Sequence, residues 1–173
     1  MRAHPAGAAF PDTPPPARTG GFGEQTCRAC HFDGELNAAG GTFSISGIPE
    51  RYTPGQTYRL TISLQRTAMQ AGGFELAARF AAGDSAGRQA GTLRASDERA
   101  QVKTAASGIQ YASHTRPGIQ LTAEGRIAWV LEWTAPESAA GDVVFHAAAN
   151  AANDDNSPLG DFIYTTADSS RSR

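Results

Sequence analysis

Two cysteines and the histidine directly after the second are the residues of this chain with the clearest capacity for chemistry: Cys27, Cys30 and His31. Their Cys-x-x-Cys-His spacing is that of a c-type haem attachment site. Each thiol would form a thioether with one vinyl group of the haem, and the imidazole of His31 would bind the iron as the proximal axial ligand. The motif therefore predicts covalently bound haem c.

The same two thiols permit other chemistry. Cys27 and Cys30 could form a disulfide, either redox-active or structural. They could also supply half of a zinc site, with His31, His114 or His146 as further ligands, although these histidines lack the paired spacing of common zinc motifs. The histidine directly after Cys30 favours haem over both alternatives.

A haem iron held by His31 takes a second axial ligand or keeps an open sixth position. His114 is the first choice, because it ends a predicted strand just before a Pro-Gly turn. His146 and Met69 are alternatives to His114, and water or an open position is a further one. His4 is set aside because it lies in a proline-rich N-terminal segment. We expect His31 and His114 to be the axial ligands, a bis-histidine pair that lowers the potential relative to His/Met ligation.

Amide and carboxylate side chains crowd the region before the last strand pattern. Oxygen ligands at this density could hold calcium, but their spacing is not that of an EF-hand, and Asn and Asp also build solvated turns. We interpret the cluster as a turn; its members are Asn150, Asn153, Asp154, Asp155, Asn156 and Asp161. The sequence has neither a Gly-x-Ser-x-Gly elbow nor a phosphate-binding glycine loop, so we predict no catalytic residues and an electron carrier in preference to an enzyme.

Length and charge exclude several classes of protein. The chain has 173 residues, enough for one domain that buries a core without disulfides. Its net charge of −2 argues against a nucleic-acid-binding protein and against electrostatic docking to an anionic membrane. Apolar runs are short, so the sequence predicts no transmembrane helix.

The chain divides into four parts by composition. Residues 1–24 are rich in proline and glycine and predict an extended arm, which lacks the apolar stretch of a signal peptide. Residues 25–40 form the haem-attachment loop, residues 41–168 a β-sandwich, and residues 169–173 a disordered tail. Haem attachment takes place outside the bacterial cytoplasm, so we expect a periplasmic, extracellular or cell-surface protein.

From Gly41 onward the hydrophobic pattern has the period of two that is typical of half-buried strands. The alternating runs cover residues 42–45, 58–64, 74–80, 127–133, 143–145 and 162–164. Turn residues separate them at Thr53-Pro54-Gly55, Gly72-Gly73, Gly83-Asp84, Arg116-Pro117-Gly118 and Ala140-Gly141-Asp142. Short strands and regular turns predict an all-β, antiparallel β-sandwich, with Trp129 and Trp133 as core anchors on one face.

Several motifs, taken together, resemble the bacterial reeler-like (reelin-type, choice-of-anchor V) domain family over residues 13–167. The first is Thr26-Cys27-x-x-Cys30-His31. The others are Tyr52-Thr53-Pro54-Gly55-Gln56-Thr57-Tyr58, Gly73-Phe74-Glu75-Leu76, Ala90-Gly91-Thr92-Leu93, Ser113-His114-Thr115, Trp133-Thr134-Ala135-Pro136, Ala147 to Asn153 and Gly160 to Thr166. The resemblance implies an immunoglobulin-like sandwich and an exported or surface location. Members with Cys-x-x-Cys-His look like monohaem c-type proteins, and the family implies no particular enzyme activity.

Three functional hypotheses follow. The first is a monohaem electron-transfer protein that serves a redox protein or a larger membrane redox or photosynthetic complex. The second is a haem-free surface adhesion or binding module with a Cys27–Cys30 disulfide. The third is a haem-based sensor or small-ligand enzyme with an open sixth position. Haem content separates the second from the others, and the spin state of the iron separates the first from the third.

Overall fold

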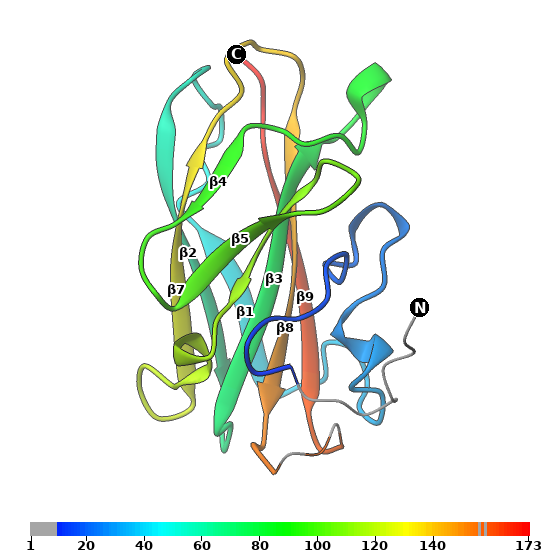
Figure 1. Ribbon diagram of the computed structural model, residues 1–173, viewed down its shortest axis with the longest axis vertical. Coiled ribbons are helices and arrows are strands. Elements are labelled where there is room, and N and C mark those ends of the chain that lie inside the picture. Colours follow the sequence, from blue (N-terminus) through cyan, green and yellow to red (C-terminus); the bar gives the residue numbers. More distant parts are fainter. Residues whose placement is uncertain (1–9, 156, 158) are drawn as a thin grey trace.

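Two antiparallel sheets form the molecule, as the computed structural model shows for residues 10–155, 157 and 159–173 (Figure 1). The four-stranded sheet has the order β1 (Gly41–Ser46), β2 (Thr57–Arg66), β7 (Arg126–Thr134) and β4 (Thr92–Ala95). The five-stranded sheet has the order β5 (Ala100–Thr104), β6 (Gln110–His114), β3 (Ala71–Phe80), β8 (Val143–Ala152) and β9 (Phe162–Ser170). The helical segments in the described residues are four 3-10 turns, namely η1 (Gly21–Gly23), η2 (Cys27–Ala29), η3 (Gly83–Ser85) and η4 (Pro117–Ile119). The all-β sandwich predicted from the sequence is confirmed.

The core lies between the sheets and is built around the two tryptophans. Trp129 and Trp133 on β7 are fully buried, and each indole N–H donates a hydrogen bond to a backbone carbonyl. Phe74 packs on Trp129 with 4.5 Å between ring centroids, and Phe145 packs edge-on against Trp133 at 4.9 Å. The tryptophans thus join strands of both sheets, in agreement with the predicted role.

β3 is buried along its whole length, although the sequence predicts a half-buried strand. Its inner face packs on the core through residues such as Phe74. Its outer face carries Glu75 and Arg79, which are buried as well. The cover comes from residues 10–40, which run along the outer face of the five-stranded sheet and are drawn in blue in Figure 1.

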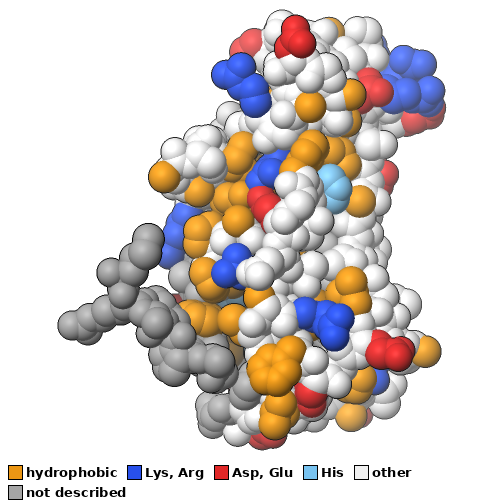
Figure 2. All heavy atoms as spheres, turned by 90° about the vertical axis from the view of Figure 1, so that its right-hand side faces the viewer, with side chains coloured by type: hydrophobic (Ala, Val, Ile, Leu, Met, Phe, Trp, Pro, Cys, Tyr) orange, Lys and Arg blue, Asp and Glu red, His pale blue; other side chains and the backbone are white. Residues whose placement is uncertain are grey.

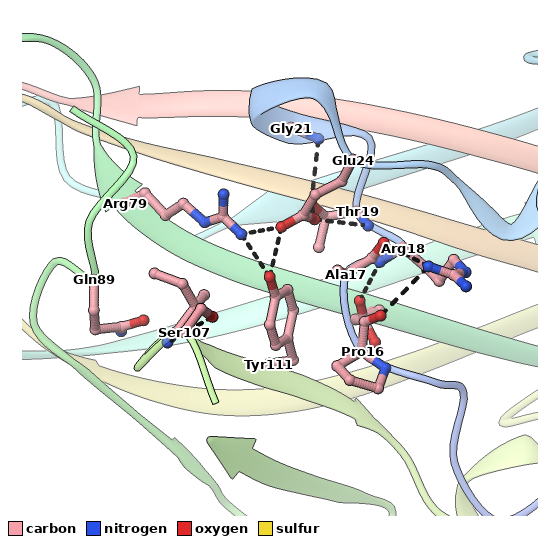
Figure 3. A network of polar contacts seen from close by, with 12 residues as sticks. Pro16, Ala17, Arg18, Thr19, Gly21, Glu24, Arg79, Gln89, Ser107 and Tyr111 are labelled. Carbon is pink, nitrogen blue, oxygen red and sulfur yellow. Dashed lines mark hydrogen bonds and ion pairs between the residues drawn. The ribbon is translucent and has the colours of Figure 1, made fainter. Parts of the chain in front are cut away.

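A network of buried polar contacts holds this cover in place (Figure 3). The Glu24 carboxylate accepts hydrogen bonds from the Arg79 guanidinium, from the Tyr111 hydroxyl at 2.5 Å and from the Thr19 hydroxyl at 2.5 Å. Arg79 also donates to the Tyr111 hydroxyl at 2.6 Å. Burial and the neighbouring Glu24 raise the pKa of Tyr111, which therefore stays a neutral donor. β3 and β6 are in this way tied to the N-terminal segment.

The predicted turn at Gly72-Gly73 is wrong, because both glycines lie in β3. The chain reverses earlier, at Thr67 and Ala68, where Ala68 takes a φ of 63°. A Cβ atom at Gly73 would lie 2.7 Å from the ring of His114, so glycine allows this side chain to approach the strand. The glycine pair marks a close approach and not a reversal of the chain.

The C-terminal residues are ordered, in contrast to the predicted tail at residues 169–173. Ser169 and Ser170 end β9, and Ser170 is fully buried. Arg171 continues the pairing, since its N–H donates to the Glu50 carbonyl and its carbonyl accepts from the Tyr52 N–H. None of the helices among the described residues is long and apolar enough to cross a membrane.

Replacing Glu24 with Gln is expected to loosen the N-terminal cover. The Glu24 and Arg79 side chains are 10% and 9% exposed, so the variant leaves a buried guanidinium without its counter-charge. We expect a loss of about 3 kcal/mol in the free energy of unfolding. Urea denaturation measures the loss, and limited proteolysis within residues 10–40 shows where the chain opens.

The matched control is Glu132→Gln, which breaks the exposed Arg94–Glu132 pair on β4 and β7. An exposed pair contributes at most about 1 kcal/mol, so this variant should unfold almost like the parent chain. Equal stabilities of the two variants would contradict the role given to the Glu24 network.

Candidate functional site

The Cys-x-x-Cys-His motif, which the sequence analysis predicts to attach haem, forms a single tight turn against β8. The hydroxyl of Thr26 accepts a hydrogen bond from the Arg28 N–H at 3.2 Å and caps the start of η2. The Cys27 carbonyl then accepts from the N–H groups of Cys30 and His31, at 3.1 and 3.0 Å. Both thiols and the imidazole therefore come from one compact loop, and the two cysteines are free thiols in the structure.

A pocket opens between this loop, the N-terminal segment and the outer face of the five-stranded sheet. It encloses about 940 Å³ of unfilled space, including the part that opens to solvent. Figure 2 shows hydrophobic side chains gathered on this side of the molecule, with single charged groups among them. The apolar lining comprises Phe10, Pro11, Pro14, Pro15, Ala71, Gly72, Gly73, Phe74, Ile119 and Ala152. The pocket thus has the apolar lining, with a few polar groups, of a small-molecule or cofactor site.

The polar lining contains the predicted site residues. Cys27, Cys30, His31 and His114 all line this one pocket, although His114 is far from the others in the sequence. The fold therefore brings both thiols and both expected axial histidines to the same space.

His31 is held by a carboxylate that the sequence analysis did not connect with it. Its Nδ1 atom lies 2.7 Å from Oδ2 of Asp161, and the amide nitrogen of Asn150 lies 3.3 Å from the same Nδ1. Asn150 comes from β8, and Asp161 directly precedes β9. The sequence did contain one indication that Asp161 matters. It lies just before the last strand pattern, within the Gly160 to Thr166 motif on which the family resemblance rests.

His114 lies where β3 and β6 stop pairing. The last β3–β6 pairs are Glu75 with Ser113 and Leu76 with Ala112, so the Phe74 backbone lies beyond the ladder. The His114 ring takes the place of a partner strand there: Nδ1 accepts from the Phe74 N–H at 3.1 Å, and Nε2 lies 3.0 Å from the Phe10 carbonyl. Burial lowers the pKa of His114, so the ring is neutral, with its proton on Nε2.

The alternative iron ligands lie elsewhere. His146 is on the outer face of β8, as its alternation predicts, but its ring packs edge-on against Phe22 at 5.5 Å and does not line the pocket. Met69 is buried in the core between the sheets. His4 lies outside the described residues. Among these alternatives, the described part of the chain places only His114 in the pocket with His31.

A second carboxylate lies beneath the attachment turn. Glu75 on β3 accepts a hydrogen bond from the Arg18 N–H at 2.6 Å, and burial raises the pKa of Glu75 to about 8. Burial, with a smaller contribution from Glu75, raises the pKa of the Cys27 thiol to about 12. Cys27 is therefore a protonated thiol at neutral pH, and its setting does not resemble that of a low-pKa redox cysteine.

The two metal alternatives find little support among the described residues. No three His, Cys, Asp or Glu side chains of this part of the chain are grouped so that they could hold a metal ion. In the predicted Asn/Asp turn, Asn150 and Asp161 face His31, while Asn153, Asp155 and Ser157 bond to one another as a turn does. Asn156 lies outside the described residues.

Comparison with known proteins identifies the family. A Reeler domain family model matches residues 25–155. The chain belongs to the Reeler domain family. Comparison with curated proteins gave no match.

Solved Reeler domains share the fold. A Reelin-N domain of F-spondin is 20% identical, with a TM-score of 0.52, over 85% of this chain and 95% of that chain. A human F-spondin reeler domain is also 20% identical, with a TM-score of 0.53, over 81% and 94% of the two chains. At 20% identity, this similarity shows that the proteins share the fold of the Reeler β-sandwich, and it gives no information about ligands.

Glu75 should make the stability of this Reeler domain fall as the pH rises. Its carboxyl has a pKa of about 8 when folded and an ordinary value of 4.5, so between these values the folded chain binds a proton that the unfolded chain has lost. The contribution of Glu75 to the free energy of unfolding then decreases with pH, by up to about 1.4 kcal/mol per pH unit. Glu75→Gln, which resembles the protonated acid, should remove this decrease.

Denaturation of the haem-free, reduced chain from pH 5 to pH 8 measures the effect. The exposed Glu124→Gln in the loop before β7 is the control and should follow the parent chain. Parallel pH profiles for Glu75→Gln and the parent would show that Glu75 is charged in the folded protein.

Proposed function

We propose that this Reeler domain is an exported monohaem c-type protein that transfers electrons. The observation that supports this most is the shared pocket, which is lined by both thiols of Cys-x-x-Cys-His, the adjacent His31 and the distant His114 together with apolar side chains. Covalent attachment suits an exported carrier, because the cofactor cannot be lost by dissociation.

The residues present fit such a cofactor. Cys27 and Cys30 would hold the haem through thioethers, and His31 and His114 would bind the iron. Nδ1 of His31 is already bonded to Asp161, which is the arrangement that metal-binding histidines use to orient the ring. The Oδ1 atom of Asn150 is buried in this pocket without a partner, as expected where a ligand is still to be received. A bound haem supplies a one-electron iron couple there.

His114 has a second hydrogen-bond arrangement within reach. Binding iron through Nε2 requires that Nε2 lose its proton and release the Phe10 carbonyl. The proton can then lie on Nδ1, which is 3.4 Å from the Phe74 carbonyl. The backbone of Phe74 thus offers a partner for either tautomer, so His114 can become a ligand without leaving a buried ring nitrogen unsatisfied.

A protein partner fits the surface beside the attachment loop. Phe32, Leu36 and Leu159 are exposed there, at 55%, 39% and 48%. Residues 25–40 and 150–165 present four exposed acids, Asp33, Glu35, Asp154 and Asp155, and one exposed arginine, Arg28. An apolar surface with an acidic surround suits a redox partner, whether a single protein or a membrane redox or photosynthetic complex, that presents basic residues.

Haem-stained denaturing gels and absorption spectra test the proposal. The chain is produced with a signal peptide in a host that has c-type maturation machinery. We expect a haem-stained band and a sharp low-spin α-band on reduction, and loss of stain in the double variant Cys27→Ser/Cys30→Ser. A colourless protein with a Cys27–Cys30 disulfide would contradict the proposal and favour the adhesion module.

His114→Ala tests the second axial ligand. We expect covalent haem to remain while the spectrum turns high-spin, and added imidazole to restore the low-spin spectrum by filling the empty position. His146→Ala, outside the pocket, is the control and should keep the parent spectrum. A low-spin spectrum in His114→Ala without added imidazole would show that another group binds the iron.

A further inference from the structure

The contact between Asp161 and His31 joins the attachment loop to the segment directly before β9. Oδ2 of Asp161 lies 2.7 Å from Nδ1 of His31, and the Asp161 side chain is 1% exposed. At this distance Nδ1 carries the proton and donates it to the carboxylate. The contact therefore fixes both the tautomer and the direction of the ring.

The carboxylate is itself held from two sides. Oδ2 accepts a hydrogen bond from the Asn150 amide at 3.0 Å, and Oδ1 accepts from the Asn153 N–H at 3.1 Å. Asn150 is on β8 and Asp161 precedes β9, so paired strands set the position of the group. Of the three partners His31, Asn150 and Asn153, His31 is the ionisable one.

A carboxylate bonded to Nδ1 of His31 would change the strength with which the ring binds iron. It raises the basicity of the imidazole, which then donates more strongly to a bound metal. Its negative charge is close to the ligand and screened little by water, so it favours the oxidised, more positive iron. Both effects lower the reduction potential.

We propose that Asp161 is the positioning residue of His31 and that it lowers the potential of the haem. This inference rests on the proposed function for its redox part. Its structural part, the Nδ1–H tautomer of His31, is independent of whether haem is bound.

Potentiometry of the haem-loaded protein tests the redox part. Asp161→Asn keeps the size of the side chain and removes its charge, and it should raise the midpoint potential while haem stain and low-spin spectrum are retained. Asp161→Glu should return the potential toward that of the parent. Asp168→Asn removes an equal, exposed charge further along β9 and should leave the potential unchanged. A haem-loaded Asp161→Asn protein with the parent potential would overturn the proposal.

Nitrogen-15 spectra of the histidines test the structural part in the haem-free Cys27→Ser/Cys30→Ser chain. We expect His31 as the Nδ1–H tautomer, and a mixture or the Nε2–H tautomer once Asp161→Asn is added. An Nε2–H tautomer of His31 with Asp161 intact would overturn the positioning role. If the parent chain never takes up haem, the proposed function fails, and this measurement still decides the role of Asp161.

Discussion

The packing of residues 10–40 on the outer face of the five-stranded sheet is the constraint on which the rest of the structure depends. Without this cover, β3 would expose Glu75 and Arg79 to water as an ordinary two-sided strand does. With it, both groups are buried and need partners, which the cover itself provides through the Arg18 N–H and the Glu24 carboxylate. The buried polar side chains of β3 therefore require the partners in residues 10–40, and those partners in turn require the sheet.

The pocket follows from this arrangement. It forms where the cover, having crossed β3, turns at η2 and leaves space above Gly72 and Gly73. The absence of a side chain at Gly73 allows the His114 ring to lie against β3, and the end of the β3–β6 ladder leaves the Phe74 backbone free to bond to that ring. On the other side, the β8–β9 connection supplies the carboxylate for His31. His114 therefore both ends the β3–β6 ladder and lines the pocket.

The sequence was sufficient for the architecture and for the residues that share one motif. Alternation with a period of two identified the strands around Trp129, and the spacing of Cys27, Cys30 and His31 predicted that these side chains come from one short segment. It failed where burial comes from a distant segment, because Glu75 and Arg79 alternate as surface residues do. The sequence also did not reveal that Asp161 is the partner of His31, because the two residues are far apart in the chain and only the fold brings them together. The prediction of a turn at Gly72 and Gly73 was wrong because glycine is favoured both in turns and where another group closely approaches a strand.

The most direct measurement is the intact mass of the exported chain, followed by a peptide map. The account predicts a chain heavier by one haem, with the added mass on a peptide that contains both Cys27 and Cys30. The mass of the bare chain, or a mass lower by two hydrogens because the two thiols have joined, would contradict it and leave a Reeler sandwich whose pocket serves another ligand.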